Sequence, residues 1–444
     1  MSALGAIALC SGNLPVSTFG AEGSPVEIRI GVDRPMVPND GNEQRVIIKI
    51  DLEGAKTVGL SRTPVNLAVV LDRSGSMSGK KLEQAKQAAH MLIDQLDESD
   101  IFSLVMYDTE VEVLVPARKL GKGKRDIQRR ISRIQTGGST ALYDGVNSGG
   151  RELREFLSEG RINRVMLLSD GIANVGPSSN REIATLGQQL AREDISVTTV
   201  GLGDDYNENL MTALSEASDA NYYYVADVEQ LPEVFRSELG ELKSLVARNI
   251  TIRIECPEGV RPIRFLGRPE KLDSRKETIE FKTLSSDQTR ELFLECAIES
   301  EALGEISEIV QVDLEFGDVE NPSATQRLKK TVVVGYTKDL KLAERTVDQG
   351  LVAEAAIYDN AVETEKAIAL ADQGNIAACR VQLESQEVNL TKAWAVAPAS
   401  QKAEIREELN AVSEAKADLS DETLSKSQRK KLKTSAYQFR NSRK

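Results

Sequence analysis

The stretch NLAVVLDRSGSMS, residues 66–78, decides the fold. Its first six residues form a short, mostly apolar run of the kind found in strands that are buried on both faces. A helical pattern starts soon afterwards and runs from Lys80 to about Leu96. Asp72, Ser74 and Ser76 therefore follow the carboxyl end of a buried strand, just before a helix. In open α/β sheets, ligands bind at this edge.

The same alternation of strand and helix continues from about residue 64 to residue 240. The expected strands are 65–71, 101–107, 111–115, 165–168, 196–200 and 222–225, and the expected helices are 80–96, 124–134, 142–156, 181–192, 209–218 and 228–242. Apolar strands separated by helices indicate a parallel sheet that is covered on both faces. We therefore predict an α/β fold with a doubly wound, mostly parallel, Rossmann-like sheet.

Two further loops bring polar side chains to the same edge of the predicted sheet. The run at 165–168 leads into the sequence SDG, which contains Asp170, and the loop GGST, which ends at Thr140, precedes another helix. Two carboxylates and three hydroxyls then describe an all-oxygen site, which selects a hard cation: Mg²⁺, Mn²⁺ or Ca²⁺. Because hydroxyls are neutral ligands, the ion would keep positive charge with which to bind an external carboxylate.

Helix capping is the alternative explanation for these residues, because Ser and Asp are favoured at helix N-termini. One such cluster would be ordinary, but three loops that converge on one sheet edge favour a metal site. A phosphate-binding loop is excluded, since only three residues lie between Gly75 and Gly79 where four are required, and Lys81 stands where Ser or Thr should bind magnesium. Asp144 is expected to cap a helix or to support the ligands.

The composition excludes several functional classes. The 444 residues carry a net charge of −13, which disfavours binding to nucleic-acid phosphates. The single histidine, His90, leaves no His-based catalytic triad, and the four cysteines contain no CxxC pair for a zinc ribbon. No stretch of 18 uncharged apolar residues is present, so no membrane span is expected. Without a nucleophile–base pair, we do not expect an enzyme.

Alternating patterns flank the α/β unit on both sides. The patterns at 26–56 and 248–336 are typical of antiparallel strands with one solvent-facing side. Because the two are alike, the economical interpretation is one antiparallel β-sandwich into which the α/β unit is inserted. From residue 338 onward the composition predicts helices only. The expected domains are 1–21 (a signal remnant or disordered segment), 22–63 and 244–337 (the two parts of the sandwich), 64–243 (the α/β unit) and 338–444 (a helical region with a basic tail).

The three loops resemble those of a von Willebrand factor A (VWA) domain. The shared features are Asp-x-Ser-x-Ser after an apolar strand, a Gly-Gly-Ser-Thr loop and Leu-Leu-Ser-Asp-Gly, and the sequences VTTVGLGDDYNENLM and YYYVADVEQLPEVF are similar to the last strands and closing helix of that family. The resemblance covers about residues 64–240. The flanks and the helical tail resemble bacterial proteins in which this domain is set into a β-sandwich, similar to inter-alpha-trypsin-inhibitor heavy chains or calcium-activated chloride channels.

This resemblance implies a metal-ion-dependent adhesion site (MIDAS). By it, Ser74 and Ser76 would bind the metal directly. Asp72 and Asp170 would bind directly or through water, and Thr140 would supply the fifth group. The sixth position would be left for an Asp or Glu of a protein ligand. We therefore expect an adhesion or scaffold module that binds a partner through the cation; the alternative is an accessory subunit that recruits an ATPase or another enzyme.

The chain ends and two cysteines leave alternatives open. Residues 1–21 contain no charged side chain and are either a degraded export signal, which favours a periplasmic, cell-surface or secreted location over a cytoplasmic one, or a flexible extension. Cys256 and Cys296 lie in similar strand contexts and would pair in an exported protein or remain buried thiols. Residues 421–444 hold eight basic and two acidic side chains, typical of a tail that contacts anionic lipid or an acidic partner, or of a solvated helix end.

Overall fold

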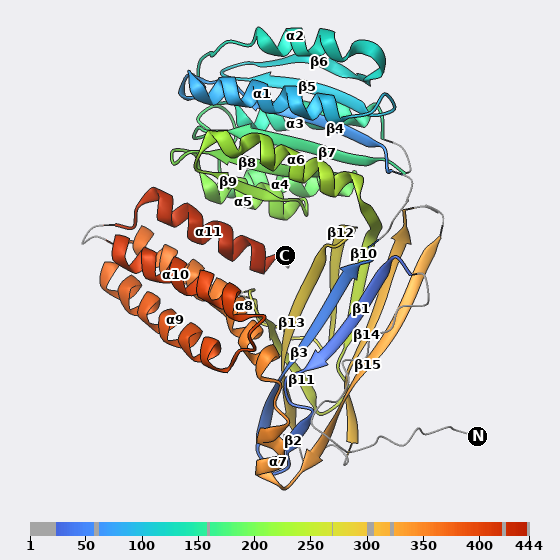
Figure 1. Cartoon of the computed structure of the whole chain (residues 1–444), viewed down its shortest axis with the longest axis vertical. Helices are drawn as coiled ribbons and strands as arrows, with labels where there is room; N and C mark the ends of the chain where they lie inside the picture. The colour runs from blue at the N-terminus through green and yellow to red at the C-terminus, as the bar shows by residue number, and fades with distance from the viewer. Residues whose placement is uncertain are drawn as a thin grey trace.

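Three units make up the chain in this computed structural model, which describes residues 24–56, 62–157, 160–268, 270–299, 306–319, 324–419 and 423–441. In Figure 1 the α/β unit lies at the top, the β-strands of the flanks lie below it, and the C-terminal helices lie beside both. The segment 1–21, with its expected export signal, is outside the described residues, as are Arg443 and Lys444 of the tail. None of the described helices is long and apolar enough to cross a membrane.

The α/β unit contains a six-stranded sheet in the order β6-β5-β4-β7-β8-β9. Neighbouring strands pair in parallel, except β5 with β6. The strands are β4 (Val65–Asp72), β5 (Ile101–Tyr107), β6 (Val111–Lys119), β7 (Ile162–Ser169), β8 (Ile195–Leu202) and β9 (Tyr222–Val225); the helices are α1 (Lys80–Gln95), α2 (Lys124–Ser132), α3 (Leu142–Arg154), α4 (Asn180–Arg192), α5 (Glu208–Ala217) and α6 (Leu231–Lys243). Helices α1, α2 and α6 cover one face, and α3, α4 and α5 cover the other. The predicted α/β fold of this region is confirmed.

The strand order reverses at β4, because the chain passes from β4 to β5 on one side and later returns to β7 on the other. All eight residues of β4 are buried, as its apolar run predicts. The carboxyl end of β4 is therefore the topological switch point at which such sheets bind ligands. Asp72 is the last residue of this strand.

Helix α3 lies very close to the sheet, and its glycines explain why. A Cβ on Gly149 would lie 2.6 Å from Val70 Cγ2, and a Cβ on Gly145 would lie 2.8 Å from Tyr107 Cδ1. Side chains at either position would push the helix away from β4 and β5, since protein interiors leave no spare volume. Because α3 begins at Leu142, this close packing sets the position of the GGST loop that precedes it.

Two β-sheets form the second unit and share one apolar core. Their orders are β1-β3-β13-β11 and β12-β10-β14-β15-β2. The strands are β1 (Val26–Val32), β2 (Met36–Pro38), β3 (Glu43–Gly54), β10 (Leu245–Glu255), β11 (Val260–Phe265), β12 (Lys276–Ser285), β13 (Thr289–Glu299), β14 (Ile306–Asp318) and β15 (Thr325–Thr337). Strand β3, which precedes the α/β unit, pairs antiparallel with β13, which follows it. The second sheet is not wholly antiparallel as expected, because the short strand β2 pairs in parallel with β15.

The C-terminal region is helical, as predicted. Its helices are α7 (Leu340–Arg345), α8 (Gln349–Asp372), α9 (Ile376–Val396), α10 (Lys402–Asp418) and α11 (Lys426–Arg440). Helices α8 to α11 share a core with Phe293 of β13. Lys49 of β3 strengthens this contact, since its Nζ lies 2.7 Å from a carboxylate oxygen of Glu354 on α8 and 3.0 Å from one of Glu291. The helical region is therefore docked on the four-stranded sheet.

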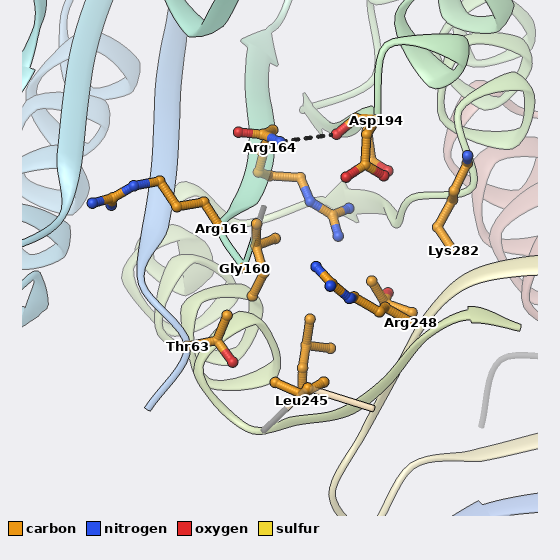
Figure 2. A pocket seen from close by; sticks show the side chains of 13 residues that line it. Thr63, Gly160, Arg161, Arg164, Asp194, Leu245, Arg248 and Lys282 are labelled. Carbon is orange, nitrogen blue, oxygen red and sulfur yellow. Dashed lines mark hydrogen bonds between the residues drawn. The ribbon is translucent and has the colours of Figure 1, made fainter. Parts of the chain in front are cut away.

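A cavity lies where the α/β unit meets the second sheet (Figure 2), and it is lined by residues of β7, β10 and β12.

In the core of the β-sheets, Cys256 and Cys296 are both buried. They are free thiols. Of the two expectations for these cysteines, the structure therefore has the thiol form.

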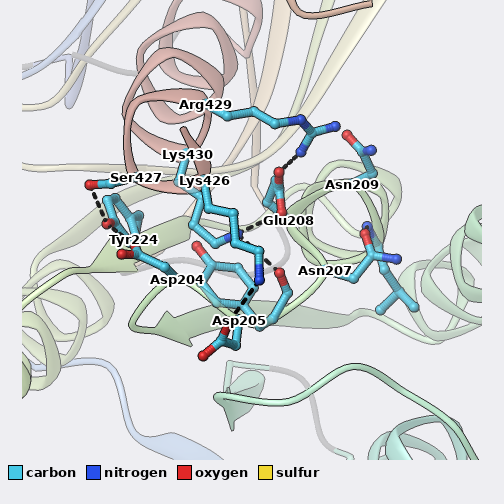
Figure 3. A network of polar contacts seen from close by, with 12 residues as sticks. Asp204, Asp205, Asn207, Glu208, Asn209, Tyr224, Lys426, Ser427, Arg429 and Lys430 are labelled. Carbon is cyan, nitrogen blue, oxygen red and sulfur yellow. Dashed lines mark hydrogen bonds and ion pairs between the residues drawn. The ribbon is translucent and has the colours of Figure 1, made fainter. Parts of the chain in front are cut away.

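The basic tail forms helix α11, which packs on the α/β unit (Figure 3). Lys430 is only 2% exposed, and its Nζ donates to Glu208 Oε2 at 2.8 Å and to the carbonyl oxygen of Tyr206 at 3.1 Å. Other ion pairs of the helix join Lys426 to Asp205, Arg429 to Asp372, Lys433 to Glu365 and Arg440 to Glu216. The expectation of a solvated end is corrected for the side chains that are paired and largely buried within the chain, which are Arg429, Lys430, Lys433 and Arg440. Lys426 and Lys431 remain exposed, so a contact of the tail with an outside anion stays a prediction.

Candidate metal site

Asp72 is fully buried at the carboxyl end of β4, and its carboxylate is held by fixed donors. Its Oδ1 accepts from the backbone N–H of Ser74 at 2.8 Å, and its Oδ2 accepts from Ser169 Oγ at 2.6 Å. Burial raises the pKa of Asp72, while the hydrogen bonds from Ser169 and Ser74 oppose that rise. A cation beside this carboxylate would favour its charged form.

Ser76 joins the first loop to the second carboxylate. Its Oγ donates to Asp170 Oδ1 at 2.7 Å and lies 3.1 Å from the Oγ of Ser74. Adjacent oxygens around an octahedral Mg²⁺ are about 2.9 Å apart, because each lies about 2.0–2.1 Å from the ion at right angles to the next. These three side chains are therefore already spaced like neighbouring ligands of one small cation.

The GGST loop brings Thr140 to the same place. Its backbone N–H donates to Asn174 Oδ1 at 2.8 Å, and its side chain is 4% exposed. The glycine after Asp170 shows where the oxygens converge. A Cβ on Gly171 would lie 3.1 Å from Thr140 Oγ1, 3.4 Å from Ser76 Oγ and 3.7 Å from Asp72 Oδ2. The structure therefore brings together all five residues predicted from the sequence, beside a glycine whose added Cβ would crowd three of them.

Lys81 is the residue of this site that the sequence did not reveal. It lies in the first turn of α1, and its Nζ is 2.5 Å from Asp170 Oδ2. Asp170 is fully buried, so the ammonium balances a charge that water does not reach. In the sequence, Lys81 is noticeable only because it occupies the position where a phosphate-binding loop has Ser or Thr. Its role depends on the distance between α1 and the end of β7, which no local pattern specifies.

The surroundings of the five oxygens are partly apolar. Ile172, the residue after Gly171, has 60% of its surface exposed. Asp144, expected to cap α3 or to support the ligands, lies in the first turn of α3 and is exposed. The chain directly after Gly171 therefore presents an apolar side chain to solvent.

The family model described as "von Willebrand factor type A domain" matches residues 66–237. This part of the chain is a VWA domain. Among the described residues, no group of three or more His, Cys, Asp or Glu side chains is arranged so that it could hold a metal ion. The donor set of the VWA domain, two carboxylates with three hydroxyls, nevertheless fits a hard cation that prefers oxygen ligands.

Curated relatives match part of this chain at low sequence identity. An uncharacterised protein of Synechocystis (sll0103) is 28% identical over 268 residues, which are 58% of this chain and 62% of that protein. Inter-alpha-trypsin inhibitor heavy chain H4 of Homo sapiens is 30% identical over 168 residues, 35% of this chain and 18% of that protein. The chain thus covers less than two thirds of the length of each of these relatives.

Solved structures share the fold of nearly the whole chain. A von Willebrand factor type A protein from Catenulispora acidiphila has a TM-score of 0.69 at 15% identity and covers 94% of this chain and 98% of its own. The ArnB paralog VWA2 from Sulfolobus acidocaldarius has a TM-score of 0.60 at 17% identity, with 93% and 99% covered. The combination of a VWA domain with these flanking units therefore occurs in other proteins.

Proposed function

We propose that this protein is a non-enzymatic interaction module whose VWA domain binds a protein partner through a divalent cation. Asp72, Ser74, Ser76, Thr140 and Asp170 would hold the ion, with Mg²⁺ as the first choice and Mn²⁺ or Ca²⁺ as substitutes. The ion would supply a positive charge with an open position for an Asp or Glu of the partner. The observation that carries the proposal is the convergence of oxygens from three loops beside Gly171.

The charge balance of the site supports a ligand that is itself anionic. The two carboxylates neutralise at most the charge of the ion, and Lys81 adds one positive charge 2.5 Å from Asp170. The site with its ion then carries a net positive charge, which favours a carboxylate over a neutral ligand. The exposed Ile172, next to Gly171 in the chain, would add apolar contact area, which commonly carries much of the affinity at protein interfaces.

The accessory-subunit alternative uses the same site and differs only in the partner. We also propose that the flanks form one β-sandwich that supports the VWA domain. Its two sheets share one core, and its strands come from both sides of the VWA domain in the sequence. The five segments expected from the sequence are proposed with it.

Titration calorimetry of the full-length protein with MgCl₂ and MnCl₂ tests the metal. We expect one ion per chain, and we expect Asp72→Ala to lose that binding. Asp144→Ala is the matched control, because it removes an exposed acid near the site without touching the five oxygens. If Asp72→Ala binds the ion as the unaltered protein does, the site assignment is wrong.

Selection of peptides from a random displayed library in Mg²⁺ tests the ligand chemistry. The selected peptides should contain Asp or Glu, lose binding in EDTA and regain it when Mg²⁺ is restored. Peptides that lack an acid, or that bind equally well in EDTA, would move the function away from the cation.

A further inference from the structure

A second polar site lies at the opposite end of the VWA sheet. The cavity of Figure 2 is lined by residues at the start of β7 and β8, whereas the candidate metal site is at the end of β4 and β7. Strand β7 has eight residues. The two sites are therefore separated by roughly 23 Å, the length of such a strand at about 3.3 Å per residue.

Basic side chains from both units face this cavity. Arg164 comes from β7, Arg248 from β10 and Lys282 from β12. Arg164 is only 4% exposed; one of its terminal nitrogens donates to Thr198 Oγ1 at 3.1 Å and lies 3.5 Å from Glu238 Oε1. Its Nε is also buried and has no hydrogen-bond acceptor among the described residues. A buried guanidinium N–H without an acceptor is costly, so this one calls for a ligand or a water molecule.

Asp194 is the acidic residue that lines the cavity, and Arg164 and Lys282 do not close the cavity by pairing with it. Its side chain lines the cavity, and its peptide is fixed because Asn163 Nδ2 donates to its carbonyl oxygen at 3.3 Å. Burial raises the pKa of Asp194, and the charges of Lys282, Arg248 and Arg164 oppose that rise. Within the described part of the chain, however, no ion pair within 4 Å joins the Asp194 carboxylate to Arg164 or Lys282. These two charges therefore lie around a space instead of closing it.

The size of the cavity restricts what can bind. Its volume is about 40 Å³. On this measure a water molecule needs about 10–15 Å³, so the cavity has room for about three water molecules. A nucleotide or a peptide side chain with its backbone would not fit, whereas a single tetrahedral oxyanion would. Oxyanions also match the planar N–H fork of arginine.

We propose that this cavity binds a small tetrahedral oxyanion, inorganic phosphate or sulfate, between Arg164, Lys282 and Arg248. The anion would accept from the unused Nε–H of Arg164 and would be contacted by the VWA domain on one side and by the five-stranded sheet on the other. Its binding would therefore stabilise the junction between the two units. This proposal is independent of the metal site, because it concerns the other end of the sheet.

Calorimetry of the full-length protein with sodium phosphate and sodium sulfate, at constant ionic strength in EDTA, tests the site and identifies the anion. We expect binding of one anion and a higher melting temperature than in chloride of the same ionic strength. Lys282→Met should weaken binding about tenfold or more. Lys276→Met is the matched control on the same strand, because its side chain is 73% exposed and pairs with Glu255.

Asp194→Asn provides a second, opposite test. It removes the negative charge that faces the anion, and asparagine tolerates the positive φ of 60° at this position. We expect tighter phosphate or sulfate binding than in the unaltered protein. If Lys282→Met is unstable in chloride, the anion affinity of Asp194→Asn tests the proposal instead. The proposal is overturned if neither anion stabilises the protein beyond chloride, or if both variants bind as the unaltered protein does.

Discussion

Lys81 and Asp170 form an ion pair in which Nζ lies 2.5 Å from Oδ2, directly beside the oxygens that converge at Gly171. The ammonium is the ion-pair partner of a fully buried carboxylate, and its positive charge repels any second cation. Lys81 should therefore set how tightly the site binds a divalent ion.

Replacing Lys81 with methionine keeps most of its apolar stem and removes this repulsion. We predict that Lys81→Met binds Mg²⁺ about tenfold more tightly than the unaltered protein, as measured by titration calorimetry. Lys80→Met is the control, since Lys80 is exposed and pairs with Glu229 away from the site. Equal or weaker Mg²⁺ binding by Lys81→Met would show that the lysine supports the site instead of competing with the ion.

A methyl group at position 171 should fill the space between the ligands. We predict that Gly171→Ala weakens Mg²⁺ binding at least about tenfold, because its Cβ would lie 3.1 Å from Thr140 Oγ1 and 3.4 Å from Ser76 Oγ. Gly240→Ala, whose Cβ would have nothing within 4 Å, should bind Mg²⁺ normally and gain up to about 1 kcal/mol of stability in α6. Calorimetry and thermal unfolding measure the two effects separately. Normal metal binding by Gly171→Ala would place the ion elsewhere.

The docking of α11 depends on a buried ion pair. Lys430 and Glu208 are 2% and 4% exposed, so Glu208→Gln would leave a buried ammonium with a weaker partner. We predict a loss of about 3 kcal/mol in the free energy of unfolding, measured with urea. Adding Lys430→Met should recover part of this loss, because the more deeply buried of the two cations that pair with Glu208 is then gone; the other, Arg429, keeps its ion pair with Asp372. A double variant that is less stable than Glu208→Gln alone would contradict this explanation.

Stability of the β-sheets should depend on pH through Asp33. Burial raises the pKa of Asp33 to about 6, although its Oδ1 accepts from the N–H of Ile47 at 2.7 Å. Since the folded pKa lies above the unfolded value of 3.8, the folded state binds the proton more tightly, and the relative stability of the protein rises as pH falls from about 7 to 4. Asp33→Asn has no such titration. Between pH 7 and pH 4, the free energy of unfolding of the unaltered protein relative to that of Asp33→Asn should rise by on the order of 2–3 kcal/mol. If urea unfolding gives the same difference in stability between the two proteins at every pH, Asp33 is not the cause of the pH dependence.

The pairing of β3 with β13 predicts which fragments fold alone. A fragment of residues 62–243 contains the whole six-stranded sheet and should unfold cooperatively. A fragment of residues 244–337 should not, because its β13 would lack β3, its central neighbour in the four-stranded sheet. Adding a peptide of residues 24–56 should restore structure, measured by circular dichroism. A stable monomer of 244–337 without the peptide would contradict the proposed insertion.

The VWA fold and its five oxygen side chains could be predicted because both are encoded locally. A strand that is buried on both faces has an apolar sequence, as at Val65–Asp72. Because the strands of a parallel sheet point the same way, their carboxyl ends lie at one edge. The loops after β4 and β7 needed no long-range information to be placed beside each other.

The features that were missed lack such a local signal. Strand β11 contains Pro262, which interrupts a strand pattern, and β2 has only three residues. The charges of Lys81 and Lys430 could be read, but their partners Asp170 and Glu208 come from other parts of the chain. The basic tail was therefore assigned to solvent or to an outside partner, although the fold buries Lys430 and pairs it with Glu208.

The register of Glu53 opposite Thr289 has a consequence for the way the protein is made. The ribosome must add more than two hundred residues after β3 before its partner strand exists. At about 5–20 residues per second, that delay is on the order of 10–50 s. The VWA domain is complete within this interval, so it forms while the β1–β3 hairpin still exposes an apolar face and an open edge. Newly synthesised chains would be most prone to aggregation at this stage, and a chaperone that covers β3 would act before β13 emerges.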